Sequence, residues 1–600
     1  MALLTARISR ATLTHVRRFF DVASSNWGNY RVNMSGAFRH ALGIGLVTLA
    51  FGVPIAFGQN STNHSEASLS ADRIGMPPLT LPMRQYLAAH PEEMRALIER
   101  VTREAATRPP SPPPPAGSPW TVVKNPIITA GNPLLLTDGT VIVTEACTGL
   151  WFKLTPDSFG QYSDGDWSQI AQMPSGYAPR FFASAVLPDG RAIAMGGEYN
   201  ASGGVCPKVG NDSNLGAIYD PVKNAWTAVA APKGWTKIGD AQSVVLDDGT
   251  FMLADALSYN AALLDAAKLT WTATGTNKAD PYDEEGWTLL PDGTVLTVNA
   301  YVPKGPACGT GSEIYDPSTG AWSNAGSTKV QLPDCNSTNP TYELGPQALL
   351  PYGIVMAFGG RTAPAKQNVA DPTAFYSTIT GKWAAGPDVP SVRGTNYTLA
   401  DAPAVVLPSG NILFAASPSQ WATKSAFPNP THFFEFDGTS ITQVADAPGA
   451  STTNSFEWNF LVLPTGQILA VDTDFTDISI YSPSGSPDPS WAPTISSFPR
   501  SVKRGSDYMI GGYQFNGLTQ GAVYGDDVQA STNYPIVRLT NVKTGHVFYG
   551  RTHDHSSMSV TPNQFSWTNF TVPAKAETGR AYLAVIANGI ASLQVTVTVD

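Results

Sequence analysis

The sequence is poor in charge and in cysteine. Asp, Glu, Lys and Arg make up 14% of its 600 residues, and it has four cysteines. The low charge content excludes a coiled coil or a helical protein with a highly charged surface, because such chains are rich in Glu, Lys and Ala. The net charge of −10 opposes attraction to nucleic acid, and no basic stripe offsets it. We therefore expect no nucleic-acid partner.

Glycine, proline and aromatic residues are abundant instead. The chain has 54 Gly and 49 Pro, together with 14 Trp, 21 Tyr and 25 Phe. Frequent Gly and Pro require frequent turns, while the aromatic residues supply a core. The composition predicts an all-β fold, and 600 residues are too many for a single core. We expect two or three domains.

Long apolar runs are scarce, and one stands near the N-terminus. Residues 41–57 are apolar, follow the basic pair Arg39 and His40, and lead into small and polar residues. This layout is typical of a secretory signal and is short for a membrane span, so we assign residues 1–58 to targeting. The alternative is an N-terminal anchor. We expect a secreted or periplasmic protein with no membrane span in the mature chain.

Residues 59–119 have the pattern of a tether. A helical pattern covers residues 81–107, and the run PPSPPPP at residues 109–115 predicts a stiff polyproline II spacer. This spacer ends just before Trp120, where the first globular domain is expected to begin.

The four cysteines are Cys147, Cys206, Cys308 and Cys335. An even number in an exported protein predicts disulfides, and no spacing among them is typical of a zinc site. Proximity in the sequence favours the pairs Cys147–Cys206 and Cys308–Cys335 among the three possible connectivities.

A short unit of apolar strand, Gly-containing turn and apolar strand repeats from about residue 130. Further along several units, an aromatic or apolar residue and Asp or Ser precede a Trp, as in Tyr219-Asp220 to Trp226. Two hairpins per period of about 50 residues predict a four-stranded propeller blade, whereas a series of β-sandwiches does not explain this recurrence. Residues 120–492 are thus predicted to form seven blades. The turns are Thr137-Asp138-Gly139, Pro188-Asp189-Gly190, Asp247-Asp248-Gly249, Pro291-Asp292-Gly293, Pro351-Tyr352-Gly353, Pro408-Ser409-Gly410 and Pro464-Thr465-Gly466.

The repeat resembles kelch repeats, with Gly196-Gly197 and Gly359-Gly360 after the second strand of their units. Residues 493–600 lack the repeat and consist of short alternating segments, which predict one immunoglobulin-like, early-set β-sandwich. A kelch-type propeller followed by such a domain resembles the galactose oxidase family of copper radical oxidases. The resemblance implies a copper site on the propeller axis and a carbohydrate substrate.

The residues that this family uses at copper are only partly matched. Its C-terminal histidine matches His553, after Thr552. Counting back from the turn glycines, its ligand tyrosine falls on Phe181, and its Tyr-His pair falls on Phe456-Glu457. Phenylalanine has no phenol oxygen to bind copper or hold a radical. The cross-linking cysteine falls on Ala130 and the covering tryptophan on Tyr199, so the sequence does not predict this radical chemistry.

The same register, nine residues before each turn glycine, is rich in carboxylates. Only 47 of 600 residues are acidic, yet four of the seven register positions are Asp or Glu. Glu285 and Glu343 lie one residue away and extend the set. Because these positions begin the innermost strands, their side chains are expected to converge on the axis. The register positions are Ala130, Phe181, Asp240, Glu284, Leu344, Asp401 and Glu457.

Converging carboxylates need a cation, shared protons or water. We predict a hard divalent cation, Ca²⁺ or Mn²⁺ rather than copper, held by Asp240, Glu284, Asp401, Glu457 and His553. The alternatives are acid/base catalysis by Glu284, Glu457 and His553, and a structural role in capping loops or pairing with basic residues. Phe181, Tyr199 and Trp458 are candidates for a substrate wall, with core packing as the alternative.

The predicted function is that of an exported, monomeric propeller protein. It acts on or recognises extracellular carbohydrate or another small polar substrate, and the carbohydrate comes from the family resemblance alone. One alternative is a copper radical oxidase that uses another tyrosine, such as Tyr342 or Tyr397. A second alternative is a non-catalytic envelope or adhesion protein.

Overall fold

The structure is a computed structural model. It describes residues 117–600, apart from residues 125, 127–129, 202–206, 208–209, 302–308, 334, 336–341, 362, 365–369, 422–427, 474–477 and 526–527. The predicted targeting segment and nearly all of the predicted tether lie outside the described residues. In the described part no helix is long and apolar enough to cross a bilayer.

Nearly all regular structure in the described residues is β-strand, as the composition predicts. The helical elements there are three single 3₁₀ turns, which are η1 (Ala450–Thr452), η2 (Ser455–Glu457) and η3 (Pro489–Trp491). The described residues belong to one compact unit of the chain.

All seven predicted hairpin turns are present, and they share one geometry. In each, a leucine carbonyl accepts a hydrogen bond from the turn glycine, as Leu136 does from Gly139 at 3.0 Å. The glycine has φ between 76° and 87°, a left-handed conformation that costs other residues energy. A type I turn followed by such a residue is a common hairpin loop. The seven glycines are Gly139, Gly190, Gly249, Gly293, Gly353, Gly410 and Gly466.

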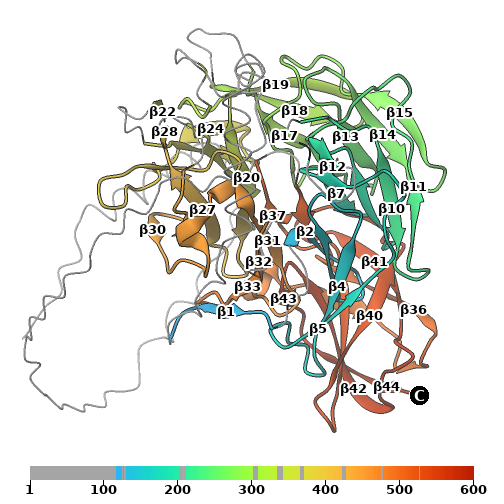
Figure 1. The fold of residues 1–600 in the computed structure, drawn as a ribbon. Helices are drawn as coiled ribbons and strands as arrows, with labels where there is room; N and C mark the ends of the chain where they lie inside the picture. Colours follow the sequence, from blue (N-terminus) through green and yellow to red (C-terminus); the bar gives the residue numbers. More distant parts are fainter. Residues whose placement is uncertain are drawn as a thin grey trace, which may run out of the picture. The chain divides into compact units, whose positions relative to one another are not determined.

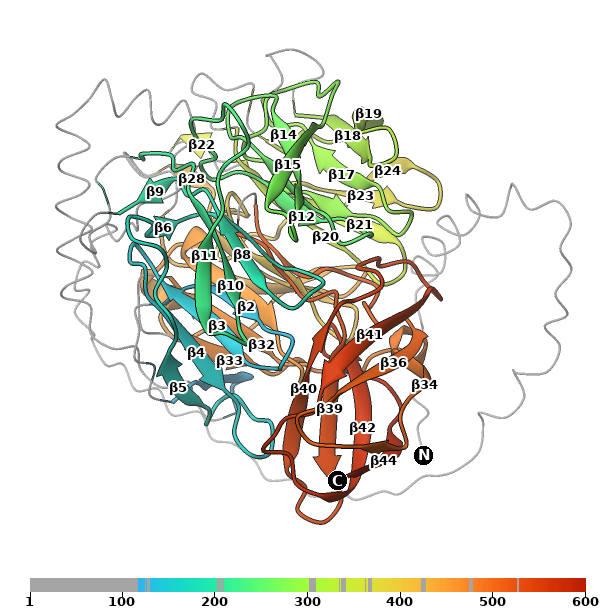
Figure 2. The ribbon, with the colours of Figure 1, turned by 90° about the vertical axis from the view of Figure 1, so that its right-hand side faces the viewer.

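Five of the hairpins begin four-stranded antiparallel sheets made of consecutive chain segments (Figures 1 and 2). The first contains β2 (Ala130–Leu135), β3 (Val141–Glu145), β4 (Trp151–Thr155) and β5 (Asp166–Gln169). The second contains β7 (Ala183–Val186), β8 (Ala192–Met195), β10 (Gly216–Asp220) and β11 (Ala225–Ala228). The third contains β12 (Ser243–Val245), β13 (Phe251–Ala254), β14 (Ala261–Asp265) and β15 (Thr270–Thr274).

The fourth and fifth sheets repeat this order. The fourth contains β16 (Thr288–Leu289), β17 (Val295–Val298), β18 (Gly311–Asp316) and β19 (Ala321–Ser327). The fifth contains β20 (Leu344–Leu349), β21 (Ile354–Gly359), β23 (Thr373–Ser377) and β24 (Lys382–Ala385). Two short pairs lie outside these sheets, β6 (Pro179–Arg180) with β9 (Tyr199–Asn200) and β22 (Ala363–Pro364) with β28 (Gln420–Trp421).

A sixth four-stranded sheet joins the two ends of the repeat region. Its strands β31 (Trp458–Val462), β32 (Ile468–Asp472) and β33 (Ile478–Tyr481) are consecutive. The fourth strand is β1 (Trp120–Val122), which pairs antiparallel with β33. An N-terminal strand thus completes the last sheet, which closes a ring of sheets and identifies the fold as a β-propeller.

The prediction of seven separate blades is wrong, because the described residues form six separate four-stranded sheets. The remaining repeat unit, β26 (Ala404–Val406), β27 (Ile412–Pro418), β29 (His432–Phe436) and β30 (Ile441–Gln443), is not a separate four-stranded sheet. Its innermost strand β26 also pairs with β37 (Gly521–Val523), which pairs with β38 (Ala530–Ser531). We call this larger sheet, which includes β25 (Tyr397–Thr398), the extended sheet.

The pattern in which an aromatic residue and Asp precede a Trp marks the outer hairpin of a blade. Tyr219 lies directly opposite Trp226 in the β10–β11 register, and their ring centroids are 5.1 Å apart. Tyr315 and Trp322 make the same cross-strand pair in the fourth sheet, at 5.5 Å. Such pairs stabilise a sheet through side-chain packing, so the signature recurs for a structural reason.

The remaining strands follow residue 493 and form a nine-stranded sheet around a separate apolar cluster. Ile510, Val537 and Phe570 belong to this cluster and are fully buried. The strands are β34 (Thr494–Ser497), β35 (Ser501–Val502), β36 (Asp507–Tyr513), β39 (Ile536–Asn541), β40 (Val547–His553), β41 (Phe565–Thr571), β42 (Gly579–Ala587), β43 (Ile590–Ala591) and β44 (Val595–Val599).

Candidate functional site

Three carboxylates meet where innermost strands begin. Each of Glu284, Glu343 and Asp401 offers one carboxylate oxygen, and these oxygens lie within 4.8 Å of one another. The residues precede β16, β20 and β26, so three neighbouring sheets contribute one each. None is more than 1% exposed. We call this group the axial carboxylates.

The backbone at two of these residues is in an unfavourable conformation. Glu284 has φ 56° and Asp401 has φ 47°, and Phe181, at the same register of the second sheet, has φ 49°. Left-handed φ is uncommon for residues other than glycine and persists where the surroundings impose it. The same strand-entry geometry therefore recurs in several sheets.

Glu343 lies against the carboxyl groups of the other two residues. It is fully buried and interacts with the side chains of Asp401 and Glu284. Burial raises the pKa of Glu343 well above its usual value, and the nearby carboxylate of Asp401 raises it further. A group in this position is stable when it holds a proton or when a cation lies beside it.

The strand pair β37–β38 brings the C-terminal region to this site (Figure 1). Strand β37 packs near β20 and β31 as well as pairing with β26. The Tyr524 hydroxyl donates a hydrogen bond to the carbonyl of Phe456 at 2.7 Å. A Cβ on Gly525 would lie 3.1 Å from Cα of Asp401, so the loop after β37 packs closely against the axial carboxylates. Glycine at position 525 permits this approach.

Two predicted ligands do not join the axial carboxylates. The carboxylate of Glu457 accepts a hydrogen bond from the backbone N–H of Asn454 at 3.0 Å, and this caps η2. Glu457 therefore has the capping role that was the alternative for these residues. Asp240 is fully buried at its register position but lies outside the group of three.

His553 lies elsewhere. Its Nδ1 is 2.7 Å from a carboxylate oxygen of Asp554, and its Nε2 is 3.6 Å from Asp507. The adjacent Thr552 N–H donates to the carbonyl of Thr137, in a hairpin turn at the far end of an inner strand. That end is on the order of 15–20 Å from where an inner strand begins. The matched Thr-His motif thus predicted the wrong position for this side chain.

The residues at the family's copper positions do come together, but they do not fit copper. The rings of Phe181 and Phe456 are 6.4 Å apart, and Phe181 is 6.2 Å from Tyr199. The register carried over from the sequence is therefore spatially correct for these side chains. Two phenyl rings supply no ligand atom for copper. Nothing in this arrangement supports phenoxyl radical chemistry.

Trp458 and the two alternative tyrosines pack against residues other than Phe181 and Phe456. Trp458 is fully buried in the main apolar cluster, and its indole N–H donates to Thr453 at 3.0 Å. Tyr397 packs on His432, with ring centroids 5.0 Å apart. Tyr342 stacks on Tyr301 at 4.7 Å. Trp458 thus has the core-packing role that was the alternative to a substrate wall.

A second group of buried carboxylates lies beside the first. Glu285 is 3.2 Å and Glu313 is 3.0 Å from the ammonium of Lys278, which also contacts Asp280. Burial acts to lower the pKa of Lys278, but the three carboxylates outweigh it and raise that pKa. We call these four residues the lysine cluster. Sequence reasoning placed Glu285 near the axis and missed the other three, although charges are close together at residues 278–285.

Two of the four predicted disulfide cysteines are described. Cys147 and Cys335 are both disulfide-bonded, and no described cysteine is free. Cys206 and Cys308 lie outside the described residues, so the predicted pairing stays a prediction.

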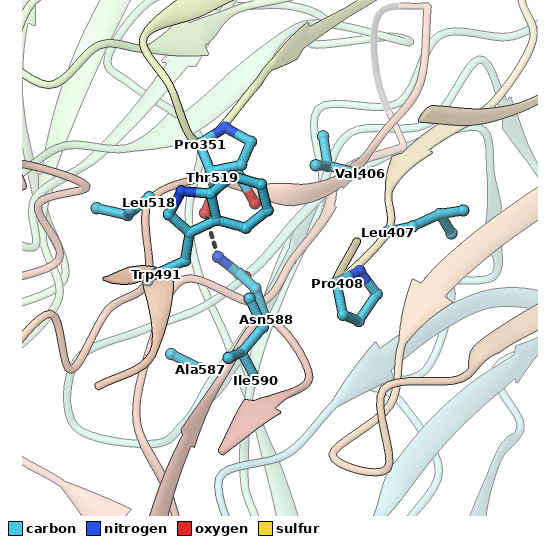
Figure 3. Close-up of a pocket in the computed structure, with 11 residues that line it drawn as sticks. Pro351, Val406, Leu407, Pro408, Trp491, Leu518, Thr519, Ala587, Asn588 and Ile590 are labelled. Carbon is cyan, nitrogen blue, oxygen red and sulfur yellow. Dashed lines mark hydrogen bonds between the residues drawn. The ribbon is translucent and has the colours of Figure 1, made fainter. Parts of the chain in front are cut away.

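Figure 3 shows a pocket between two hairpin turns of the propeller and the C-terminal strands. Pro351 and Pro408 approach from the turns, and Trp491 covers one side. Nδ2 of Asn588 donates a hydrogen bond to the carbonyl of Thr519 at 2.6 Å. The pocket contains none of the predicted site residues and is lined mainly by apolar groups.

No protein-family model matches the chain. The kelch-like protein terF of Aspergillus terreus is 30% identical over 131 residues, which cover 21% of this chain and 25% of that protein. The chain thus matches about a quarter of the length of this curated relative.

Among solved structures, a fungal alcohol oxidase of the AA5 family in complex with copper is similar at 14% identity. The similarity covers 82% of this chain and all of that one, with a TM-score of 0.43. YCF48 bound to D1 peptide is similar at 11% identity, over 62% of this chain and 99% of that one, with a TM-score of 0.39. The propeller assignment rests on the strand pairing of this chain.

Proposed function

We propose that the axial carboxylates bind a divalent cation that links three sheets of the propeller. The observation that carries this proposal is the convergence of Glu284, Glu343 and Asp401, whose oxygens lie within 4.8 Å of one another in a buried position. Two oxygens that each lie about 2.3–2.6 Å from one Ca²⁺ are at most about 5.2 Å apart. The observed separation fits a shared ion.

Oxygen ligation favours Ca²⁺ or Mn²⁺ over copper. Three ionised carboxylates repel one another in a buried site, and a cation replaces that repulsion with attraction. Since all three side chains are buried, we assign the cation a role in holding the inner strands and the β37–β38 pair together, rather than a role in contacting a large substrate.

A second candidate function is proton sharing between Glu343 and Asp401. The raised pKa of Glu343, caused by burial and by Asp401, supports a carboxyl pair that keeps one proton near neutral pH. Such a pair is suited to acid/base chemistry, and it competes with cation binding because a bound cation favours the ionised form.

Metal analysis and thermal unfolding test the proposal. We expect the protein stripped with EDTA to bind one Ca²⁺ or Mn²⁺ and to unfold at a higher temperature in its presence. At a free cation concentration of 100 times Kd, the gain is about 2.7 kcal/mol. Glu343→Gln and Asp401→Asn are expected to abolish this gain.

Asp240→Asn is the matched control, because Asp240 is equally buried at the same register but outside the group. This variant is expected to keep the cation-dependent gain. If the stripped wild-type protein binds neither ion and its unfolding temperature does not respond, the cation proposal is wrong, and a carboxyl pair that titrates near neutral pH takes its place.

The finer architecture and the location are part of the same proposal. We infer that residues 493–600 form an immunoglobulin-like domain, supported by their strands, which are antiparallel except for the β35–β44 pair and surround a separate apolar cluster. The kelch-like relative and the hairpin repeat support a kelch-type propeller. The bonded cysteines support export to the secreted or periplasmic space.

A further inference from the structure

Four large apolar side chains are exposed on two neighbouring strands of the C-terminal sheet. They are Met509 and Tyr513 on β36, and Phe565 and Trp567 on β41, with exposed fractions of 58%, 43%, 51% and 39%. Single exposed apolar residues are normal, whereas a contiguous group on one surface marks a binding site. We call this group the aromatic face.

The strand register places the group on one side of the sheet. Tyr513 lies opposite Phe565, Gly511 opposite Trp567, and Met509 opposite Asn569. Residues directly opposite share a face, and so do residues two apart on one strand. The alternate residues Ile510 and Phe570 are fully buried in the apolar cluster on the other side. The aromatic face is therefore the outer side of this sheet, where β36 and β41 lie side by side (Figure 2) and β40 pairs with β41.

Two features fix the rings in place. Phe565 meets Tyr513 edge to face, with ring centroids 5.5 Å apart. A Cβ on Gly511 would lie 3.0 Å from the end of the Phe565 ring, so that ring lies across the backbone of Gly511. The surface is thus ordered before a ligand arrives, which lowers the entropy cost of binding.

One end of the aromatic face carries hydrogen-bonding groups. His553 of β40 lies opposite Asn569, and Arg551 lies opposite Thr571. The Thr571 hydroxyl donates to Asp507 at 2.5 Å, and Asp507 is 3.6 Å from His553. These groups combine donors and acceptors. The acidic Asp507 lies close to basic side chains, so this end has no strong charge of one sign.

We propose that the aromatic face binds an uncharged glycan. One side of a pyranose ring presents C–H groups that pack on aromatic rings, while the hydroxyls at its rim need donors and acceptors such as Asn569 and Asp507, whose side chain is 62% exposed. A row of rings beside a polar, nearly neutral end matches both needs. An anionic polymer gains little here because Asp507 faces the same surface.

The exposed area argues against a second copy of this chain as the occupant. An aromatic side chain presents about 150–250 Å², so four side chains that are about half exposed offer on the order of 400 Å². A stable protein interface buries about 800 Å² on each partner. A chain of a few sugar rings covers an area of the size that is available.

This inference does not depend on the cation proposed for the propeller. The aromatic face shares no residue with the axial carboxylates, and EDTA treatment is not expected to affect glycan binding. Failure of one proposal is therefore distinguishable from failure of the other.

Affinity electrophoresis and pull-down with the full chain test the inference. The probes are soluble xyloglucan, mixed-linkage β-glucan and galactomannan in gels, and insoluble cellulose and chitin in pull-downs. We expect the wild-type protein to be retarded or retained by at least one of them. Trp567→Ala and Phe565→Ala are expected to weaken that binding about tenfold or more, as loss of an aromatic anchor does.

Trp567→Tyr, which keeps a ring for stacking, is expected to recover most of the binding. The matched control is Leu593→Ala, because Leu593 is 91% exposed and does not belong to the aromatic face. An unchanged unfolding temperature in each variant confirms that the fold is intact.

Three results would each overturn the inference. The first is no binding to any of the five glycans, and the second is binding that Trp567→Ala leaves unchanged. The third is a wild-type dimer in light scattering that becomes a monomer in Trp567→Ala, which assigns the aromatic face to self-association.

Discussion

The axial carboxylates and the lysine cluster each contain three buried carboxylates, but only the lysine cluster also contains a basic side chain. Glu285, Asp280 and Glu313 surround the ammonium of Lys278. Glu343, by contrast, faces Asp401 and Glu284. The chain supplies its own cation to one group, and the other group contains none among its three members.

This difference shows why a count of buried acidic residues does not identify a cation site. The lysine cluster satisfies its carboxylates internally, with Asn299 donating hydrogen bonds to Asp280 at 2.5 Å and to Glu313 at 2.6 Å. Its positive charge comes from Lys278, although burial still raises the pKa of Glu285 well above its usual value. Among the axial carboxylates, Glu343 faces other carboxyl groups and is stabilised by a proton or a cation, which makes the stability of this group dependent on solution conditions.

Removal of the Lys278 ammonium is expected to have the largest effect on the unfolding free energy. Lys278→Met leaves three buried carboxylates without a counter-charge, which costs about 3–5 kcal/mol of unfolding free energy. The shift of the urea unfolding midpoint measures this loss. Lys268→Met is the control, because Lys268 pairs with Asp265 on the surface and its loss is expected to leave the midpoint unchanged. Equal shifts for both variants would contradict the assigned role of Lys278.

Removal of one charged acceptor from the lysine cluster is expected to have a smaller effect. Asp280 accepts hydrogen bonds from Lys278, from Asn299 and from the backbone N–H of Tyr301 at 3.0 Å. Asp280→Asn is expected to lower the unfolding free energy by about 1.5–3 kcal/mol, the value of hydrogen bonds to charged groups. A neutral or stabilising result would mean that the two carboxylate groups do not differ as described.

The equivalent change among the axial carboxylates is expected to raise the unfolding free energy instead of lowering it. Glu343→Gln removes a buried ionisable group that faces two other carboxyl groups, so the metal-free protein should gain about 1–2 kcal/mol at pH 7. With saturating Ca²⁺ the gain should disappear, because wild type is then stabilised by the ion. Destabilisation of the metal-free variant would overturn this reading of Glu343.

The pH dependence of stability, compared between wild type and Glu343→Gln, gives a further test. The folded protein keeps a proton on Glu343 above pH 4.5, where the unfolded chain loses it, so raising the pH lowers the stability of metal-free wild type. His555 acts in the opposite direction, because burial lowers its pKa from 6.5 to about 3 and acid then favours unfolding. The difference between wild type and Glu343→Gln cancels the His555 contribution and isolates Glu343.

The repeat was predictable from sequence because its signals are local. Each turn glycine is required by a left-handed backbone, and the pairing of Tyr219 with Trp226 follows from strand alternation. The register of Glu284 and Asp401 follows because each lies at a constant spacing from its turn.

The rest depends on contacts between distant segments. Counting back from Gly353 reaches Leu344, but the β20–β21 register shifts between Leu344 and Gln347, and the side chain at the site is that of Glu343. The extended sheet was missed because no local pattern shows that residues 521–523 pair with β26. His553 was misplaced because a two-residue motif does not determine where its strand lies.

The closure of the ring has a consequence for the order of events during synthesis. Strand β1 pairs with β33, and β26 pairs with β37, and in both cases the partner is synthesised much later. Neither β1 nor β26 is therefore fully paired until most of the chain has left the ribosome. Contacts this distant in sequence are slow to form. Resistance to protease should thus appear late on nascent chains, only after residue 531 has emerged, and a shorter nascent chain leaves strand edges open to aggregation.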